Sequence, residues 1–154
     1  MSGEPRLAAE EVRRLLGLEA HPEGGWFRQT FRHQPPSGGR GESTAIYYLL
    51  AAGEHSRWHR LFDADEVWLF HAGDPLELAL WSPGSAVLTQ RLGNDLRAGE
   101  QPQWVVPRGV WQSARPLGEW TLVSCTVAPA FEYGRWELAE ASWEPSEAPP
   151  AAGR

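Results

Sequence analysis

The chain has 154 residues, a length typical of one domain, and a formal net charge of -6 with no lysine among its 14 cationic side chains. This acidic balance argues against nucleic acid as a partner, because binding to a phosphate backbone requires a basic surface. The apolar fraction of 42% and the 9 tryptophans exceed what a disordered chain carries, so the composition predicts a single buried core.

Residues 7–16 form the first predicted element, a short amphipathic helix. Apolar residues recur in it at intervals of three and four, and charged residues occupy the opposite side. Gly17 suits the position directly after a helix end. We expect this helix to pack on the rest of the domain.

Short strands follow the helix. Apolar runs separated by turns predict strands at residues 26–31, 44–50, 56–60, 66–70, 76–81, 87–92, 104–107, 111–115 and 120–127, with a last short strand or helix within 131–138. Closely spaced strands without βαβ alternation predict an all-β sandwich or closed barrel. The single domain is predicted to span residues 1–143, and the Pro- and Ala-rich tail at 144–154 to be disordered.

The strand at 26–31 has a polar face. Alternation places Trp26, Arg28 and Thr30 on one side of it. If that side faces the interior, Arg28 is a buried cation that needs an anion, so Arg28 and Thr30 are candidate ligand-binding residues. The Gly- and Pro-rich loop at 33–42 is the expected mobile segment of the domain.

Residues 53–78 are the stretch in which polar side chains able to do chemistry alternate with large apolar ones. Arg57 and His59 are two residues apart and would leave an extended strand on the same face. A turn rich in Asp separates this strand from the next one. The next strand has a second candidate inner face, formed by Glu66, Trp68 and Phe70.

Two short motifs resemble those of the cupin superfamily. Glu66 and Gly73 have the spacing that ends the first cupin motif, and the second motif, Pro-x-Gly-x-x-His, is matched except in its last residue by Pro107, Gly109 and Gln112. The chain also resembles one branch of small single-domain cupins that is catalogued as a domain of unknown function. The segments that carry this resemblance are HPEGGWFRQTFR (21–32), STAIYYLL (43–50), GDPLEL (73–78) and VVPRGVWQSAR (105–115). The resemblance implies a cupin-type β-barrel, a jelly-roll-like double-stranded β-helix, with a short N-terminal helix. It also implies a small-molecule ligand and a homodimer.

The usual metal ligands of cupins are incomplete in this chain. Arg57 stands at the position of the first histidine of the first motif, and Gln112 replaces the histidine of the second. His59, Glu66 and Gln112 supply one nitrogen and two oxygens, and glutamine is a poor ligand for zinc or iron. His71 has the opposite strand parity to Glu66. The sequence therefore predicts neither a bound metal nor another cofactor.

His59 is the candidate base, since imidazoles exchange protons near neutral pH. Glu66 would orient its ring, and Arg57 would bind a carboxylate or phosphate of the substrate. The Arg-x-His pair resembles that of metal-free deoxysugar-nucleotide 3,5-epimerases, in which the histidine is the base and a tyrosine the acid. The sequence does not choose among Tyr47, Tyr48 and Tyr133 for the acid, and Tyr48 is carried as the candidate catalytic tyrosine.

Three functions remain open at this point. The first is a metal-independent isomerase, epimerase or lyase acting on an anionic sugar-like or oxo-acid substrate. The second is a non-catalytic module in which Trp68, Phe70 and Gln112 line a metabolite pocket. The third is a divergent metal-dependent cupin oxygenase.

The remaining reactive side chains have plain structural interpretations. Cys125 is the only cysteine and lies in an apolar run, which predicts an inert buried thiol. His21, His33 and His55 fall in loops or turns and are expected to be solvated. No apolar stretch has the length of a signal peptide or a membrane span, so a cytoplasmic protein without membrane contact is expected.

Overall fold

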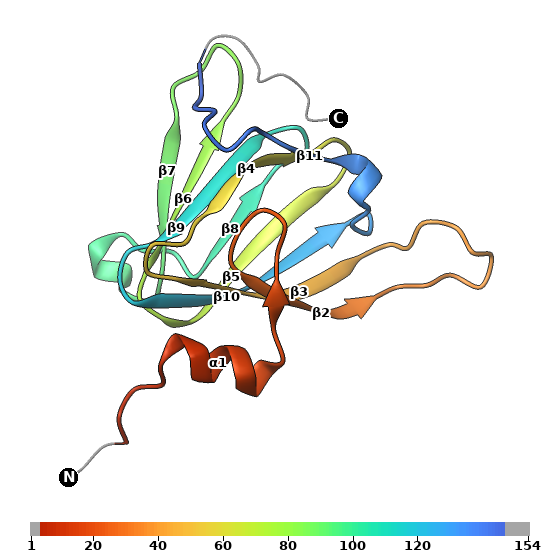
Figure 1. Ribbon diagram of the computed structural model, residues 1–154. Helices are drawn as coiled ribbons and strands as arrows, with labels where there is room; N and C mark the ends of the chain where they lie inside the picture. The colour runs from red at the N-terminus through yellow and green to blue at the C-terminus, as the bar shows by residue number, and fades with distance from the viewer. Residues whose placement is uncertain (1–3, 147–154) are drawn as a thin grey trace.

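A computed structural model describes residues 4–146 as two antiparallel sheets packed face to face, with one short helix against the outside of the first sheet (Figure 1). The elements are α1 (Ala9–Leu16), β1 (Glu19–Ala20), β2 (Trp26–Arg32), β3 (Thr44–Ala51), β4 (Ser56–Leu61), β5 (Asp65–Gly73), β6 (Leu76–Trp81), β7 (Leu88–Leu92), η1 (Leu96–Ala98), β8 (Gln103–Val106), β9 (Trp111–Pro116), β10 (Trp120–Ala128), η2 (Tyr133–Arg135) and β11 (Trp136–Leu138). The predicted all-β class with an N-terminal helix is confirmed. Most of the predicted tail, residues 147–154, lies outside the described residues.

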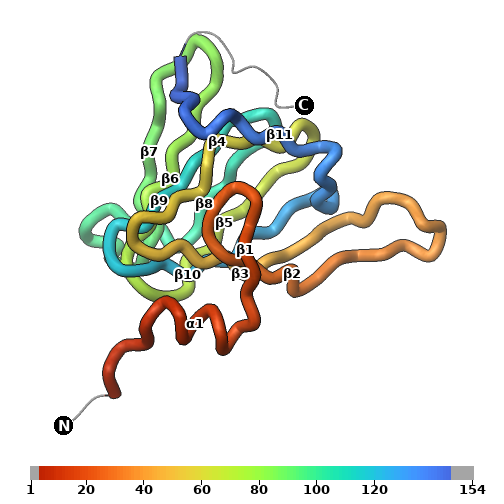
Figure 2. The backbone as a smooth tube through the Cα atoms, in the orientation of Figure 1, coloured from red at the N-terminus to blue at the C-terminus, as the bar shows by residue number. Residues whose placement is uncertain are grey.

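The strand order is that of a jelly roll. The first sheet has six strands in the order β1-β2-β3-β10-β5-β8, and the second has five in the order β11-β4-β9-β6-β7. From β3 to β6 and again from β7 to β11, successive strands alternate between the sheets, as the smooth trace in Figure 2 lets the reader follow. Among the described strands no hydrogen-bonded pair joins the two sheets, so the interior lies between two layers.

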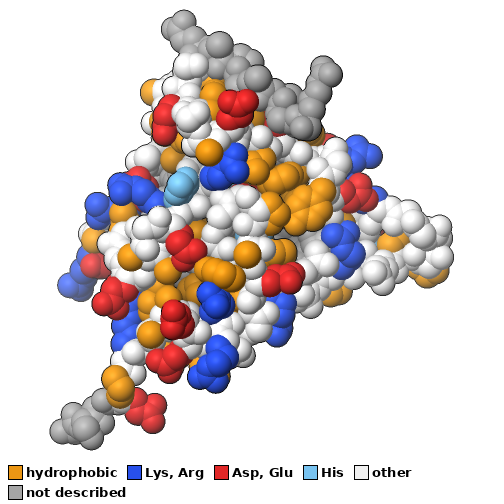
Figure 3. Space-filling model, in the orientation of Figure 1, with side chains coloured by type: hydrophobic (Ala, Val, Ile, Leu, Met, Phe, Trp, Pro, Cys, Tyr) orange, Lys and Arg blue, Asp and Glu red, His pale blue; other side chains and the backbone are white. Residues whose placement is uncertain are grey.

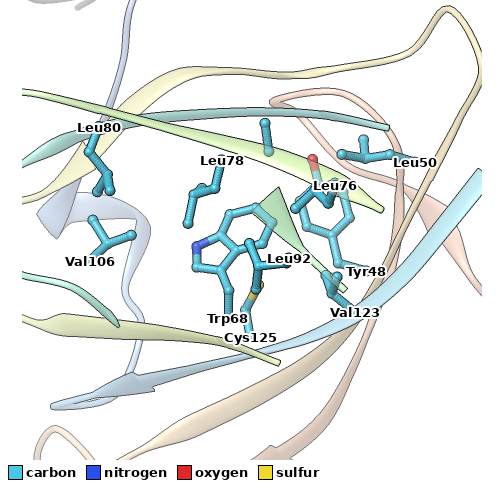
Figure 4. Packing of buried hydrophobic residues seen from close by; sticks show 11 residues of the cluster. Tyr48, Leu50, Trp68, Leu76, Leu78, Leu80, Leu92, Val106, Val123 and Cys125 are labelled. Carbon is cyan, nitrogen blue, oxygen red and sulfur yellow. The ribbon is translucent and has the colours of Figure 1, made fainter. Parts of the chain in front are cut away.

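One half of that interior is solid. Apolar side chains from both sheets interdigitate there around Trp68, which is fully buried (Figure 4). Its ring lies 5.9 Å from that of Tyr48, measured between centroids. Truncating such an aromatic side chain typically costs about 3 to 5 kcal/mol. This cluster fixes the spacing of the sheets and leaves the other half of the interior open.

The helix α1 packs where the sequence pattern indicates. Its buried residue Val12 contacts Leu49 of β3 and Trp120 of β10. Gly17 ends the helix with a left-handed φ of 64°, and its N–H donates to the carbonyl oxygens of Arg13 and Arg14. The predicted C-cap is confirmed.

The last described segment packs on the outside of the second sheet. The short strand β11 pairs with β4, and both figures of the backbone show it along that edge (Figures 1 and 2). Five residues beyond it, Trp143 packs against a cluster of tryptophans from three strands of the sheet, Trp58, Trp81 and Trp111. The centroid separations from Trp143 to these rings are 5.9, 5.5 and 5.3 Å.

The surface carries charges of both signs. On the face in Figure 3, acidic and basic side chains are interspersed. Six arginines pair with carboxylates within residues 4–146, and Asp63 receives two of them. In the same residues no helix is both long enough and apolar enough to cross a membrane.

Candidate functional site

A cavity of about 370 Å³ occupies the open half of the interior between the two sheets. Its volume is at the lower end of the range for small-molecule sites. Polar groups at one part of its wall come from both sheets and from the turn before β2; they are His21, Glu23, His59 and Glu66. Another part of the wall is aromatic and is formed by Phe131, Tyr133 and Trp136.

Glu23 reaches the cavity because of the turn that follows it. Gly24 and Gly25 have φ values of 109° and 75°, which L side chains rarely adopt. A Cβ at Gly24 would also overlap with the carbonyl group of His55, so glycine is required there. The turn therefore brings the chain close to β4 and directs the Glu23 side chain inward, where the residue is buried.

Three side-chain donors surround the Glu23 carboxylate. Ser56 Oγ donates to Oε1 at 3.0 Å, and Trp136 Nε1 approaches Oε2 at 3.4 Å. His59 Nε2 lies 3.3 Å from the same Oε2. The carboxylate paired with His59 is thus Glu23, which the sequence analysis missed, and not Glu66.

The proton positions on His59 follow from its neighbours. Nδ1 lies 2.6 Å from the carbonyl oxygen of Arg57, and a carbonyl oxygen can only accept, so Nδ1 carries a proton. Nε2 lies 3.3 Å from Oε2 of Glu23, the position at which a second ring proton would be shared with that carboxyl group.

Glu66 is the second acid of the cavity. Its Oε1 accepts from Gln112 Nε2 at 2.7 Å, and Gln112 Oε1 accepts in turn from Trp68 Nε1 at 2.8 Å. The pKa of Glu66 is raised to about 7. Burial is the main cause and the charge of Glu23 adds to it, while the charge of His59 and the Gln112 bond oppose the rise. Glu66 therefore exchanges its proton near neutral pH, as an ordinary carboxyl does not.

His21 is buried and lines the cavity, so the expectation that it is solvated is wrong. Its Nδ1 accepts the backbone N–H of Glu23 at 3.1 Å, which leaves the proton of the neutral ring on Nε2. Burial lowers the pKa of His21, more than Glu23 raises it. Because the ring is neutral, its 4.0 Å approach to the Glu23 carboxylate is not an ion pair.

Three predicted ligand-binding residues do not line the cavity. Arg28 is exposed, donates from Nη1 to the carbonyl of Leu16 at 2.9 Å, and lies over Tyr47 on the outer face of the first sheet. Thr30 is exposed and donates to the Ala45 carbonyl at 3.2 Å. Arg57 bonds the carbonyl of Ala139 through Nη2. Arg28 and Thr30 were candidates on the condition that their side of the strand faces the interior, and this condition is not met, because Phe27 and Gln29 line the cavity instead.

Of the other predicted site residues, some pack in the hydrophobic core and one supports the cavity. Tyr48 donates its hydroxyl to the Gly24 carbonyl, and burial raises its pKa well above the usual value, so it is not placed to donate to a ligand. Trp68 and Phe70 pack in the core cluster, away from the cavity wall. Gln112 is buried and holds Glu66 in place. Of the three tyrosines considered, Tyr133 lines the cavity.

The residues of the cavity do not fit a cupin metal centre. Within residues 4–146 no group of three or more His, Cys, Asp or Glu side chains is arranged to hold a metal ion. Both polar ends of Gln112 are engaged, with Glu66 and Trp68, and both nitrogens of His59 face other partners. We therefore derive no chemistry through a metal.

Comparison with known proteins identifies a family whose model matches most of the chain. The family model described as "Cupin superfamily (DUF985)" matches residues 10–139, which include every residue named above as lining the cavity. "Uncharacterized protein YML079W" of Saccharomyces cerevisiae is 29% identical over 151 residues, covering 84% of this chain and 74% of the yeast protein.

Two solved structures are also similar. Protein SO0799 from Shewanella oneidensis has a TM-score of 0.80 and 40% identity, covering 86% of this chain and 85% of its own. A hypothetical protein from Leishmania major has a TM-score of 0.77 and 30% identity, covering 85% of this chain and 86% of its own. Neither name states an activity or a ligand.

Proposed function

Because the chain belongs to the cupin superfamily, in the family described as DUF985, we propose that its cavity is the active site of a metal-independent isomerase, epimerase or lyase. The proposed substrate is a small sugar-like or oxo acid with a C–H bond next to a carbonyl group. One observation carries the proposal: Glu66, with a pKa of about 7, shares a cavity with the His59–Glu23 pair. Proton-exchanging groups with such different environments are typical of acid–base catalysis.

The structure supports an exchange of the roles expected from the sequence. Near pH 7 a substantial fraction of Glu66 is ionised and can remove a proton from the substrate carbon. The electron pair of the broken C–H bond then moves onto the carbonyl oxygen. We propose that the substrate oxygen takes the place of Glu23 Oε2 beside His59 Nε2, so that His59 becomes the donor that stabilises this enolate oxygen. Where the deprotonated carbon carries a hydroxyl group, return of the proton from Glu66 to the former carbonyl carbon, with transfer of that hydroxyl proton to the enolate oxygen, completes an isomerisation.

Epimerisation at one carbon needs a donor on the opposite side of the substrate. Tyr133 is the tyrosine that lines the cavity, and burial raises its pKa above the usual value, so it keeps its proton at neutral pH. It is half-exposed at the aromatic wall, with its ring 5.5 Å from that of Trp136. We propose Tyr133 for the role first considered for Tyr48.

The test is solvent exchange. Incubation of the purified chain in D2O with a panel of sugar acids and 2-oxo acids, followed by NMR, should show deuterium entering next to a carbonyl group. The rate should rise with pH through about 7, as Glu66 ionises, and fall at least 100-fold in Glu66→Gln.

Glu10→Gln, on the exposed side of α1, is the matched control and should retain the rate. Exchange that is absent for the whole panel, or that persists in Glu66→Gln, would refute the proposal. One tightly bound transition-metal ion per purified chain would refute its metal independence.

A further inference from the structure

The cavity wall contains one permanent cation, Arg32 of β2, among the described residues that line it. Its Nε donates to Gln29 Oε1 at 3.2 Å, and its Nη2 donates to the carbonyl oxygen of Phe131 at 2.8 Å. Both acceptors are neutral. Within residues 4–146 no carboxylate forms an ion pair with Arg32, so its charge is held in position without being neutralised.

A β-bulge aims Arg32 at the cavity. Along β2, Phe27 and Gln29 face inward, and strict alternation would turn Arg32 outward. The pairing with β3 shifts between Gln29 and Phe31, so that Arg32 lies opposite Thr44, which also lines the cavity. Bulges of this kind re-aim side chains next to functional sites.

Three carboxyl groups share the wall with this arginine. Glu19, Glu23 and Glu66 all line the cavity, and His59 is already paired with Glu23. A ligand with one negative group can place it on Arg32, but a second negative charge would meet carboxylates. This charge distribution favours a monoanion over a neutral molecule and over a dianion.

The shape of the wall near Arg32 suits a ring. Phe131, whose carbonyl holds Arg32, packs edge-to-face on Tyr133 at a centroid distance of 4.9 Å, and Tyr133 does the same on Trp136 at 5.5 Å. Aromatic faces offer a large, rigid apolar surface to a ligand. The cavity of about 370 Å³ has room for a molecule of monosaccharide size.

We infer that Arg32 selects a monoanionic substrate of the hexuronic-acid class, with the carboxylate on Arg32 and the sugar ring against the aromatic wall. This deepens the proposed function and rests on it for the reacting end of the molecule, which lies toward Glu66 and His59. The anion contacts first expected of Arg28 and Arg57 are thereby assigned to Arg32.

Binding of three probes to the full chain tests this inference. D-glucuronate carries one negative charge, D-glucose none, and D-glucose 6-phosphate close to two at neutral pH. Titration calorimetry at pH 7 should show D-glucuronate binding at least about ten-fold more tightly than either of the others, as expected for one charge-assisted contact.

Arg32→Gln should lose this preference while its affinity for D-glucose stays within about two-fold. Arg32→Lys, which retains the charge without the guanidinium fork, should keep part of it. Arg28→Gln is the matched control outside the cavity and should bind all three probes as the unchanged chain does.

Equal affinities for the three probes, no measurable binding of D-glucuronate, or a preference that survives in Arg32→Gln would each overturn the inference. The two proposals fail separately. A charge preference without deuterium exchange would refute the catalytic function and leave the proposed role of Arg32 standing. Deuterium exchange on neutral sugars without a charge preference would refute the role of Arg32 and leave the catalytic function standing.

Discussion

Replacing Glu66 by glutamine should make the stability of the protein less dependent on pH. In the folded chain the pKa of Glu66 is about 7, against 4.5 for the unperturbed group, and burial is the main cause. Below pH 4.5 the carboxyl is protonated in both the folded and the unfolded state. Between pH 4.5 and about 7 the unfolded chain has released this proton while the folded chain still holds it, so stability falls as the pH rises through this window and is level above it.

The magnitude follows from the two pKa values. One pKa unit corresponds to about 1.36 kcal/mol, so the displacement from 4.5 to about 7 amounts to roughly 3 kcal/mol. Glutamine keeps an oxygen that can accept the 2.7 Å bond from Gln112 and has no charge to bury. The stability of Glu66→Gln relative to the unchanged chain should therefore increase by up to about 3 kcal/mol between pH 4.5 and pH 8.

Urea unfolding followed by tryptophan fluorescence at intervals over this pH range measures the difference. Glu10→Gln is the control. It removes a carboxylate from the exposed side of α1, so its stability difference shows how much a change in surface charge alone contributes. If the stability difference for Glu66→Gln is flat from pH 4.5 to pH 8, Glu66 is not in an apolar environment, and both the stability reasoning and its catalytic role are wrong.

Two further predictions concern the turn before β2 and the C-terminal segment. Gly24→Ala should lower stability by at least about 2 kcal/mol more than Gly38→Ala, because both positions have positive φ but only at Gly24 would the Cβ meet backbone atoms. Urea unfolding measures this, and equal losses would contradict the close approach to His55. Trp143→Ala should cost about 2 kcal/mol or more, since its ring packs on three other tryptophans. Unchanged unfolding would show that the segment after β11 contributes no packing.

The fold could be predicted because its signals are local. The strand Leu76–Trp81 begins and ends where the apolar run does, and Gly17 caps α1 where the amphipathic pattern stops. Apolar residues recur every two residues in a strand and about every 3.6 residues in a helix. These patterns are visible in a short stretch of sequence, so they can be recognised without knowledge of the tertiary structure. Glu66 was also found on this basis, because β5 alternates regularly around it.

The site could be predicted only in part, because several of its members depend on contacts remote in sequence. Glu23 lies in a turn without periodicity, and its inward direction is set by the approach of Gly24 to His55. An acidic residue followed by two glycines was the available signal, since it marks a backbone that must take unusual angles next to a charged group. Tyr48 shows the converse. Its side chain points into the interior, but its hydroxyl donates to the Gly24 carbonyl and therefore is not free to donate to a substrate.

Each sheet presents one nitrogen-bearing side chain to the cavity through a break in regular pairing, Arg32 from β2 and His59 from β4. In β4 the register shifts between Ser56 and His59, so one extra residue turns His59 inward and Arg57 outward, although they are two apart in sequence. In β2 the shift after Gln29 does the same for Arg32. A bulge leaves backbone groups unpaired and is retained at a cost in ladder hydrogen bonds. Two of them, one in each sheet, which direct His59 and Arg32 at the same cavity, are therefore better explained by binding and proton transfer than by stability.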